Sequence, residues 1–214
     1  MFRWSAYILL AFYGGGAVAL LGMRWITPPL TALQVQRRVE SWLRRGTYTK
    51  RHDPVPLSRI SRQLQHAVIA AEDGRFYQHS GIDWLELRKV RKDWERGRPR
   101  GGSTITQQLV KNLFFTSHRS PLRKAAEFAL APLAEVLLPK DRILELYLNH
   151  IEWGPGVYGA EAAAWYHYRI PAAAVGREEA ARLAAVIPAP LDRRPRRMHD
   201  YSAEILERMA MMGW

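Results

Sequence analysis

The N-terminal part of the chain carries a long apolar run. Trp4–Met23 contains no charged side chain, and Arg3 and Arg24 flank it. About 20 apolar residues suffice to cross the hydrocarbon core of a bilayer. The alternatives are a buried core helix and a cleaved signal peptide processed at Ala17-Val18-Ala19. Because the apolar run continues past that site, we expect residues 1–26 to form a retained transmembrane anchor.

The pattern changes after this run. Thr27-Pro28-Pro29 interrupts it, since proline does not continue a helix. Over residues 31–45 apolar positions recur at helical spacing, and the positions expected to face inward are Leu33, Val39, Trp42 and Leu43. Residues 48–56 are polar and contain proline, which predicts a connector. We therefore assign residues 27–57 to a membrane-proximal helix and connector.

The remaining residues, 58–214, are dominated by helical periodicity. Ser58 is a candidate cap for a helix that ends near Glu72, and its inward positions are Ile60, Leu64, Ala67, Val68 and Ala71. Further helices are predicted over 82–94, 104–114, 122–138, 140–152, 160–168, 177–187 and 200–212. Almost no segment alternates with period two, as strands do. The sequence therefore predicts one mainly α domain.

Charge narrows the set of partners. The chain has 32 Lys and Arg against 20 Asp and Glu, a net charge of +12. A basic domain points to an anionic partner such as nucleic acid, lipid headgroups or a phosphorylated substrate. No nucleic-acid-binding motif accompanies the charge, so we expect no nucleic acid. The chain has no cysteine, which excludes disulfides and thiolate metal sites.

The first candidate site is an acidic pair with an aromatic residue and a histidine at fixed spacing, Glu72-Asp73-x-x-Phe76-x-x-His79-x-Gly81. A carboxylate at a helix C-terminus faces unpaired carbonyl groups, and Asp73 adds a like charge. Both effects raise the pKa of Glu72. A general base works best with a pKa near the working pH. Glu72 is therefore a candidate base, with a solvated helix-end carboxylate as the alternative.

The second candidate is the polar run from Gly101 to Gln108, which lies at the start of a predicted helix. Free N–H groups at a helix N-terminus suit phosphate or sugar oxygens. Ser103 is also a candidate helix cap. Cationic side chains suited to an anionic leaving group follow this run, namely Lys111, Arg119, Arg123 and Lys124. A glycine-hinged polar loop beside a carboxylate is how a site handles a sugar and an anionic leaving group.

Together these blocks carry a family resemblance. With Arg123-Lys124-x-x-Glu127, Lys140–Asn149 and Gly159–Ala164, they resemble the peptidoglycan glycosyltransferases, the lipid II polymerases of glycosyltransferase family 51. The resemblance is to the stand-alone form, because the transpeptidase motifs Ser-x-x-Lys and Lys-Thr-Gly do not occur. It implies a lysozyme-like helical fold. The chain departs from the family at Trp165–Ile170, where a Tyr-Phe-Gly-like run is usual, so a local turn there is in doubt.

The resemblance also implies an activity and roles for the site residues. The enzyme would polymerise lipid II into linear glycan strands by inverting transfer to the 4-hydroxyl of the acceptor sugar, releasing undecaprenyl diphosphate. Glu72 would be the catalytic base and Glu127 the second essential carboxylate, holding Mg²⁺ or Mn²⁺ at the diphosphate or orienting a cationic side chain. No organic cofactor is implied. The expected substrate-binding residues are Asp73, Phe76, His79, Ser103, Thr104, Gln107, Gln108, Lys111, Asn112, Arg119, Arg123 and Lys124.

The resemblance further implies a location and partners. We expect a single-pass protein of the inner membrane, with a cytoplasmic N-terminus and a periplasmic catalytic domain. Its partners would be lipid II, the growing lipid-linked strand, the bilayer and cell-division or elongation proteins.

Two other readings remain. One is a lysozyme-like lytic transglycosylase that cleaves glycan strands. The other is a non-enzymatic basic membrane protein that binds anionic lipid or nucleic acid through Arg91–Arg100 and Arg193–Arg197. The cationic set disfavours the lytic reading, since a neutral glycan does not need it.

Overall fold

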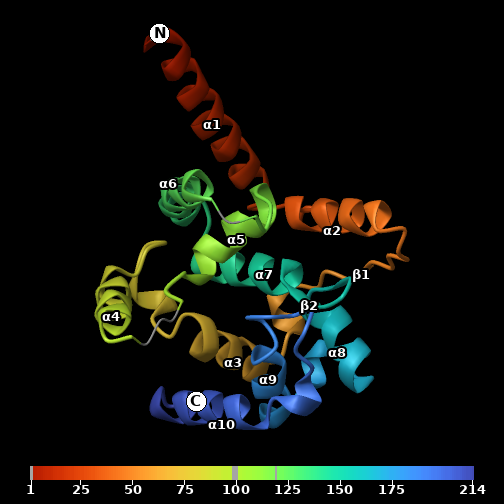
Figure 1. Cartoon of the computed structure of the whole chain (residues 1–214). Helices are drawn as coiled ribbons and strands as arrows, with labels where there is room; N and C mark the ends of the chain where they lie inside the picture. The colour runs from red at the N-terminus through yellow and green to blue at the C-terminus, as the bar shows by residue number, and fades with distance from the viewer. Residues whose placement is uncertain (1, 98–100, 119) are drawn as a thin grey trace.

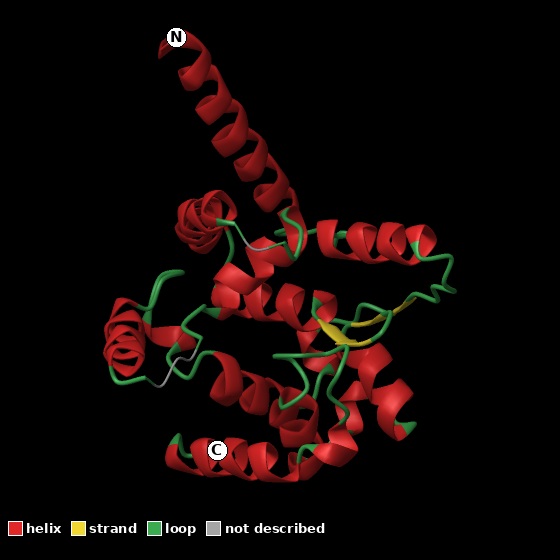
Figure 2. Cartoon of the chain, viewed as in Figure 1, coloured by secondary structure: helices red, strands yellow, loops and turns green. Residues whose placement is uncertain are grey.

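The computed structural model describes residues 2–97, 101–118 and 120–214, with the backbone alone for residues 2–6 and 8–10. Helices dominate the described chain, and only a small patch of sheet interrupts them (Figure 2). The α-helices are α1 Phe2–Gly22, α2 Ala32–Leu43, α3 Arg62–Glu72, α4 Trp84–Glu95, α5 Ile105–Phe114, α6 Pro121–Leu137, α7 Lys140–His150, α8 Ala160–Tyr168, α9 Arg177–Ala184 and α10 His199–Met211. The predicted mainly α fold class is confirmed.

α1 extends away from the body of the protein, and only its C-terminal part contacts the domain (Figure 1). There it packs against α6, where Leu20 is fully buried. Gly16 permits a close approach, because a Cβ at this position would lie 3.0 Å from the Leu130 side chain. The segment after α1 is fixed by Arg142, which donates hydrogen bonds to the Met23 carbonyl at 2.8 Å and to Thr27 Oγ1 at 3.1 Å.

The predicted anchor, residues 1–26, lies partly outside the described side chains. Among the side chains that are described, no helix combines the length and hydropathy needed to cross a bilayer.

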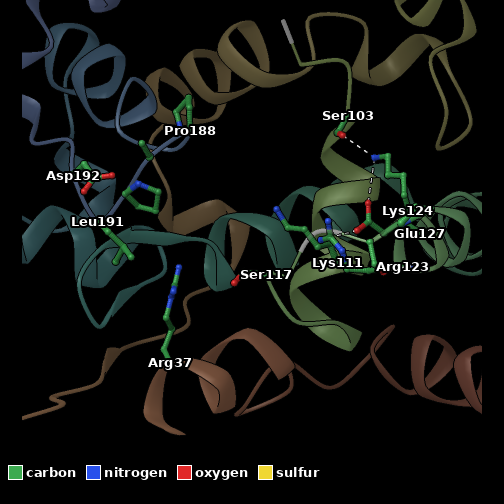
Figure 3. Close-up of a pocket in the computed structure, with 14 residues that line it drawn as sticks. Arg37, Ser103, Lys111, Ser117, Arg123, Lys124, Glu127, Pro188, Leu191 and Asp192 are labelled. Atoms are coloured by element: carbon green, nitrogen blue, oxygen red, sulfur yellow. Dashed lines mark hydrogen bonds and ion pairs between the residues drawn. The ribbon is translucent and has the colours of Figure 1, made fainter. Parts of the chain in front are cut away.

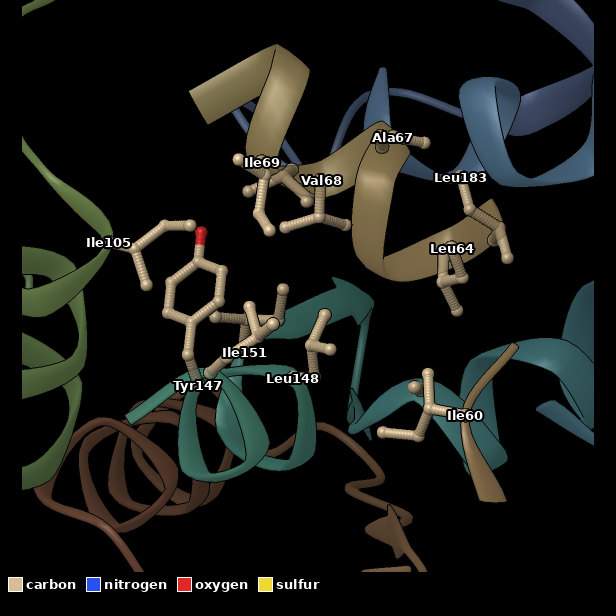
Figure 4. Packing of buried hydrophobic residues seen from close by; sticks show 14 of the residues in the cluster. Ile60, Leu64, Ala67, Val68, Ile69, Ile105, Tyr147, Leu148, Ile151 and Leu183 are labelled. Atoms are coloured by element: carbon tan, nitrogen blue, oxygen red, sulfur yellow. The ribbon is translucent and has the colours of Figure 1, made fainter. Parts of the chain in front are cut away.

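α5 and α7 lie at the centre of the domain (Figure 1). α5 packs against α6 and α7, while α3 packs against α9 and α10. The apolar positions of α3 and α7 face one another, and Tyr147 inserts between them with Ile69, Ile105 and Ile151 around its ring (Figure 4). Burying apolar surface of this kind is the main stabilising contribution to the fold.

The sheet was not predicted. It consists of β1 Arg51–His52, β2 Glu152–Gly154 and β3 Val157–Tyr158, in the order β1-β3-β2. β3 pairs with β1 in parallel and with β2 in antiparallel register. Each strand is too short for alternation to show in the sequence. The sheet ties the predicted connector to the loop after α7.

Two predictions about helix starts and faces were wrong. Ser61, not Ser58, caps α3, because its hydroxyl accepts from the Leu64 backbone N–H. In α2, Leu33 is buried as predicted, but Val39, Trp42 and Leu43 are exposed, Trp42 to 76%. The buried face of α2 turns Leu33 and Gln34 inward, and α2 packs against α5.

The turn after α8 forms without the glycine that the resemblance led us to expect. Arg169 adopts the left-handed conformation, with φ of 64° and ψ of 30°, and its N–H donates to the Trp165 carbonyl. Glycine adopts this conformation freely, whereas a residue with a Cβ is strained in it. The chain therefore keeps the turn at a cost in stability.

Candidate active site

Glu72 is the last residue of α3, and its side chain points toward α5. Its Oε2 accepts a hydrogen bond of 2.7 Å from Gln108 Nε2. Burial raises the pKa of the Glu72 carboxyl above its ordinary value, while Gln108 and Lys111 oppose the rise and Asp73 adds to it. The direction agrees with the sequence argument, but burial rather than the Asp73 charge is the larger cause.

Asp73 links three parts of the site. Its carboxylate lies 2.9 Å from His79 Nε2, and its Oδ2 accepts from the Ile105 backbone N–H at 2.9 Å. Asp73 is itself buried, and Phe76 is fully buried in the core. These contacts place Glu72 by fixing the end of α3 against the start of α5.

The start of α5 is held by a reciprocal cap. Thr104 Oγ1 accepts from the Gln107 backbone N–H, and Gln107 Oε1 accepts from the Thr104 backbone N–H, each at 3.1 Å. Gln107 is consequently buried rather than turned toward a cavity. The predicted cap by Ser103 is wrong, because Thr104 takes that position. Ser103 Oγ instead accepts from Lys124 Nζ at 2.9 Å.

Glu127 is buried on α6 between two cations (Figure 3). Its Oε1 lies 3.0 Å from Arg123 Nη1, without hydrogen-bond alignment, and its Oε2 lies 3.2 Å from Lys124 Nζ. Lys111 points into the same cavity from α5. Burial lowers the pKa of Lys111, and the nearby Glu127 charge opposes that shift. The carboxylate therefore holds a cluster of cationic side chains in place.

Two cavities meet at the start of α5. The cation cavity, of about 890 Å³, is lined by the cationic residues of α5 and α6 and by the loop 188–192. The Glu72 cavity, of about 780 Å³, is lined by Glu72, Gln108, Arg193, Tyr201 and Arg208 among others. Ser103 and Pro188 line both cavities. A carboxylate with a raised pKa thus lies in one compartment and a cation cluster in the adjoining one.

The remaining predicted residues lie around this junction. Thr104 donates to the Gly81 carbonyl at 2.6 Å. Asn112 is buried and lines a smaller cavity with Lys111 and Gln108. Arg119 lies outside the described residues.

Several cavity residues were missed by the sequence reasoning. Arg37 on α2 and Asp192 line the cation cavity, while Lys89, Arg193 and Arg208 line the Glu72 cavity. Arg193 belongs to a basic run that the sequence reasoning linked only to a non-enzymatic protein. Since these residues come from α2, α4 and the C-terminal part, no short motif contains them.

Two places in the site offer carboxylate oxygens to a cation. Ligand atoms of Asp73, His79 and Asp83 lie within 4.8 Å of one another, but Asp83 caps α4 and pairs with Arg75 while Asp73 binds Ile105 and His79. We interpret that group as a structural junction. Glu127 Oε1 is buried without a hydrogen-bond partner. This oxygen fits a divalent cation only if a bound anionic ligand supplies the other oxygens, because the cationic side chains of Arg123 and Lys124 already flank Glu127.

The chain is similar to known proteins over nearly its whole length. Residues 39–212 match the transglycosylase family model. A biosynthetic peptidoglycan transglycosylase from Pseudomonas entomophila strain L48 is 43% identical over 210 residues, covering 96% of this chain and 89% of the relative. A protein of the same name from Pseudomonas putida strain W619 is 43% identical and covers 100% of this chain and 92% of the relative. Another from Pseudomonas syringae pv. syringae strain B728a is 46% identical and covers 85% of this chain and 78% of the relative.

Proposed function

The chain belongs to the transglycosylase family, and from this premise we propose how its cleft joins two lipid-linked sugars. The protein is a peptidoglycan glycosyltransferase that polymerises lipid II into glycan strands. The observation that supports the mechanism is the junction at Ser103 and Pro188, where the Glu72 cavity adjoins the cation cavity. A transfer reaction needs a base on one side of the reacting carbon and a stabilised leaving group on the other.

Glu72 acts as the general base in this proposal. The acceptor sugar lies in the Glu72 cavity, and its 4-hydroxyl gives its proton to Glu72 as it attacks the anomeric carbon. A carboxyl whose pKa is raised by burial accepts a proton more readily than an ordinary surface carboxyl. Gln108 keeps the carboxylate aimed by its 2.7 Å hydrogen bond. Attack from the face opposite the leaving group inverts the anomeric centre.

The diphosphate leaving group lies in the cation cavity. Lys111, Arg123 and Lys124 surround it, and positive charge fixed in advance stabilises the negative charge that develops on the departing oxygen. Glu127 keeps Arg123 and Lys124 in position through its two ion pairs. Arg119 is proposed to join this set, as the resemblance implies.

A divalent cation, Mg²⁺ or Mn²⁺, is proposed to travel with the diphosphate. Glu127 would hold the cation, which would supply positive charge to stabilise the leaving group. No organic cofactor is needed for this reaction. Loss of activity on chelation, restored by Mg²⁺, is the expected observation.

α1 is proposed as a single-pass anchor in the inner membrane, with the N-terminus cytoplasmic and the domain periplasmic. Its 21 residues would extend about 30 Å, the thickness of a bilayer core, and the C-terminal part that packs against α6 would hold the domain at the membrane surface. α2 runs sideways from the base of α1 (Figure 1), and it exposes Val35, Val39 and Trp42 on one face. Such a helix suits the membrane interface, where lipid II must be reached.

A label at α2 tests this placement. The chain has no native cysteine, so Val39→Cys and Trp165→Cys each accept one fluorophore. In vesicles we expect lipid-borne quenchers to quench the label at position 39 strongly and the label at position 165 weakly. Equal quenching at both positions contradicts the placement of α2.

The activity is tested by gel-resolved polymerisation of labelled lipid II beside the Glu72→Gln protein. A ladder of long glycans from the wild type and none from the variant supports both reaction and base. Shortening of preformed glycan without any ladder would instead identify a lytic transglycosylase. Anionic-lipid binding that is unaffected by Glu72→Gln, without either reaction, would identify a non-enzymatic membrane protein.

A further inference from the structure

Tyr147 is a fully buried residue of α7 whose hydroxyl points toward the site. Its ring is enclosed by Ile69, Ile105 and Ile151 (Figure 4). The hydroxyl donates a hydrogen bond of 3.0 Å to Gln108 Oε1. A phenol in an apolar core needs such a partner, because an unsatisfied buried O–H group is destabilising.

Gln108 passes this contact on to Glu72. A glutamine side chain has one end that only accepts and one end that only donates hydrogen bonds. Tyr147 occupies the accepting oxygen, so the donating nitrogen faces Glu72 Oε2 at 2.7 Å. A donor at this position favours the ionised carboxylate over the neutral acid.

The reversed amide would be unfavourable. It would place Gln108 Oε1 against the Glu72 carboxylate, so that two acceptors face each other. It would also turn the amide nitrogen toward Tyr147 and leave the phenol proton without its acceptor. Burial raises the pKa of Tyr147 well above its ordinary value, so the phenol keeps its proton and remains a donor. The buried hydroxyl therefore sets which end of Gln108 faces the carboxylate.

We infer that Tyr147 is a positioning residue, whose hydroxyl fixes the Gln108 amide so that Glu72 is held in its proton-accepting form. The inference rests on the proposed role of Glu72 as general base. Tyr147 touches no substrate in this scheme and acts only through Gln108.

The test is the pH dependence of kcat/KM for lipid II polymerisation by the full-length Tyr147→Phe protein. Losing the fixed donor raises the pH at which Glu72 ionises, so the acid limb moves to higher pH. At the pH values of the acid limb, we expect kcat/KM of the variant to be roughly three- to tenfold lower than that of the wild type. The difference should disappear at alkaline pH. Tyr158→Phe is the matched control, because Tyr158 is also fully buried but its hydroxyl contacts Tyr48 and Glu152. Its acid limb should stay in place.

A second variant tests the inference even if the Tyr147→Phe protein does not fold. Gln108→Met removes the donor directly and should move the acid limb at least as far. Adding Tyr147→Phe to Gln108→Met should then move it no further. An unmoved limb in Gln108→Met, or a uniform loss at every pH in Tyr147→Phe, overturns the inference. Full activity of Glu72→Gln overturns the proposed base itself, which distinguishes the two failures.

Discussion

Asp73 Oδ2 accepts a hydrogen bond of 2.9 Å from the backbone N–H of Ile105, so the residue after Glu72 satisfies the first free N–H group of α5. We expect Asp73→Asn to lower the free energy of unfolding by about 1–3 kcal/mol, because a charged acceptor is lost from a buried N–H group. Urea unfolding measures this loss. Asp53→Asn, at an exposed position, should leave the midpoint unchanged, and equal midpoints for both variants would refute the link.

Glu72→Gln should lower turnover by ~10²–10⁴-fold while the protein stays folded. It should also raise thermal stability at neutral and alkaline pH. The pKa of Glu72 is raised in the folded state, so stability falls as pH rises from the ordinary carboxyl pKa, about 4.3, through the folded value. Calorimetry should therefore find no gain near pH 4 and a growing gain above it. A gain that is the same at every pH would contradict a raised pKa.

Lys111→Met should weaken use of the lipid-linked donor. We expect kcat/KM to fall roughly tenfold or more, because hydrogen bonds to charged groups are the stronger ones. Initial rates at varied donor concentration measure the effect. Lys92 is exposed on α4, so Lys92→Met controls for the loss of one positive charge, and the two variants should differ clearly.

Arg169→Gly should stabilise the protein by about 1 kcal/mol, since glycine adopts the left-handed conformation without strain. Arg169 is exposed, so little else changes. Arg169→Ala keeps the Cβ and should bring no gain. Thermal unfolding of the two variants side by side checks this. Similar melting temperatures for both would mean that the left-handed turn carries no strain.

His150 should contribute to the loss of folded-state stability at acid pH. It is fully buried beside His52, and burial lowers its pKa to about 3, with the His52 charge as the next cause. Its contribution to stability is present above the ordinary histidine pKa, about 6.5, and is lost as pH falls toward the folded value. His150→Leu should flatten the fall in stability over this range. The control His118→Leu, at an exposed position, should leave the fall in stability unchanged. Identical curves for both variants would contradict a role for His150 in acid sensitivity.

The candidate base Glu72 and the helices were accessible to sequence reasoning because both depend on local pattern. Helical spacing places the end of α3 at Glu72, and the structure ends α3 there. The pattern does not say which neighbour a helix face meets. Val39 and Trp42 were therefore assigned to a core, although both side chains are exposed.

Contacts in the site between residues far apart in the chain could not be predicted from local pattern. Arg37 and Arg193 lie more than a hundred residues apart, and only folding brings them to adjoining cavities. The Tyr147 contact with Gln108 also spans two helices. The sheet was missed because two or three residues cannot display an alternating pattern.

The hydrogen bonds from Arg142 to Met23 and Thr27 have a consequence for the motion of the whole enzyme. They fasten the segment after α1 to α7, and the buried Leu20 side chain packs α1 against the domain at the same junction. If α1 is the membrane anchor proposed above, a rotation of that helix about its axis would also reorient the cleft. The orientation of the active-site cleft relative to the bilayer would then be set by the orientation of α1.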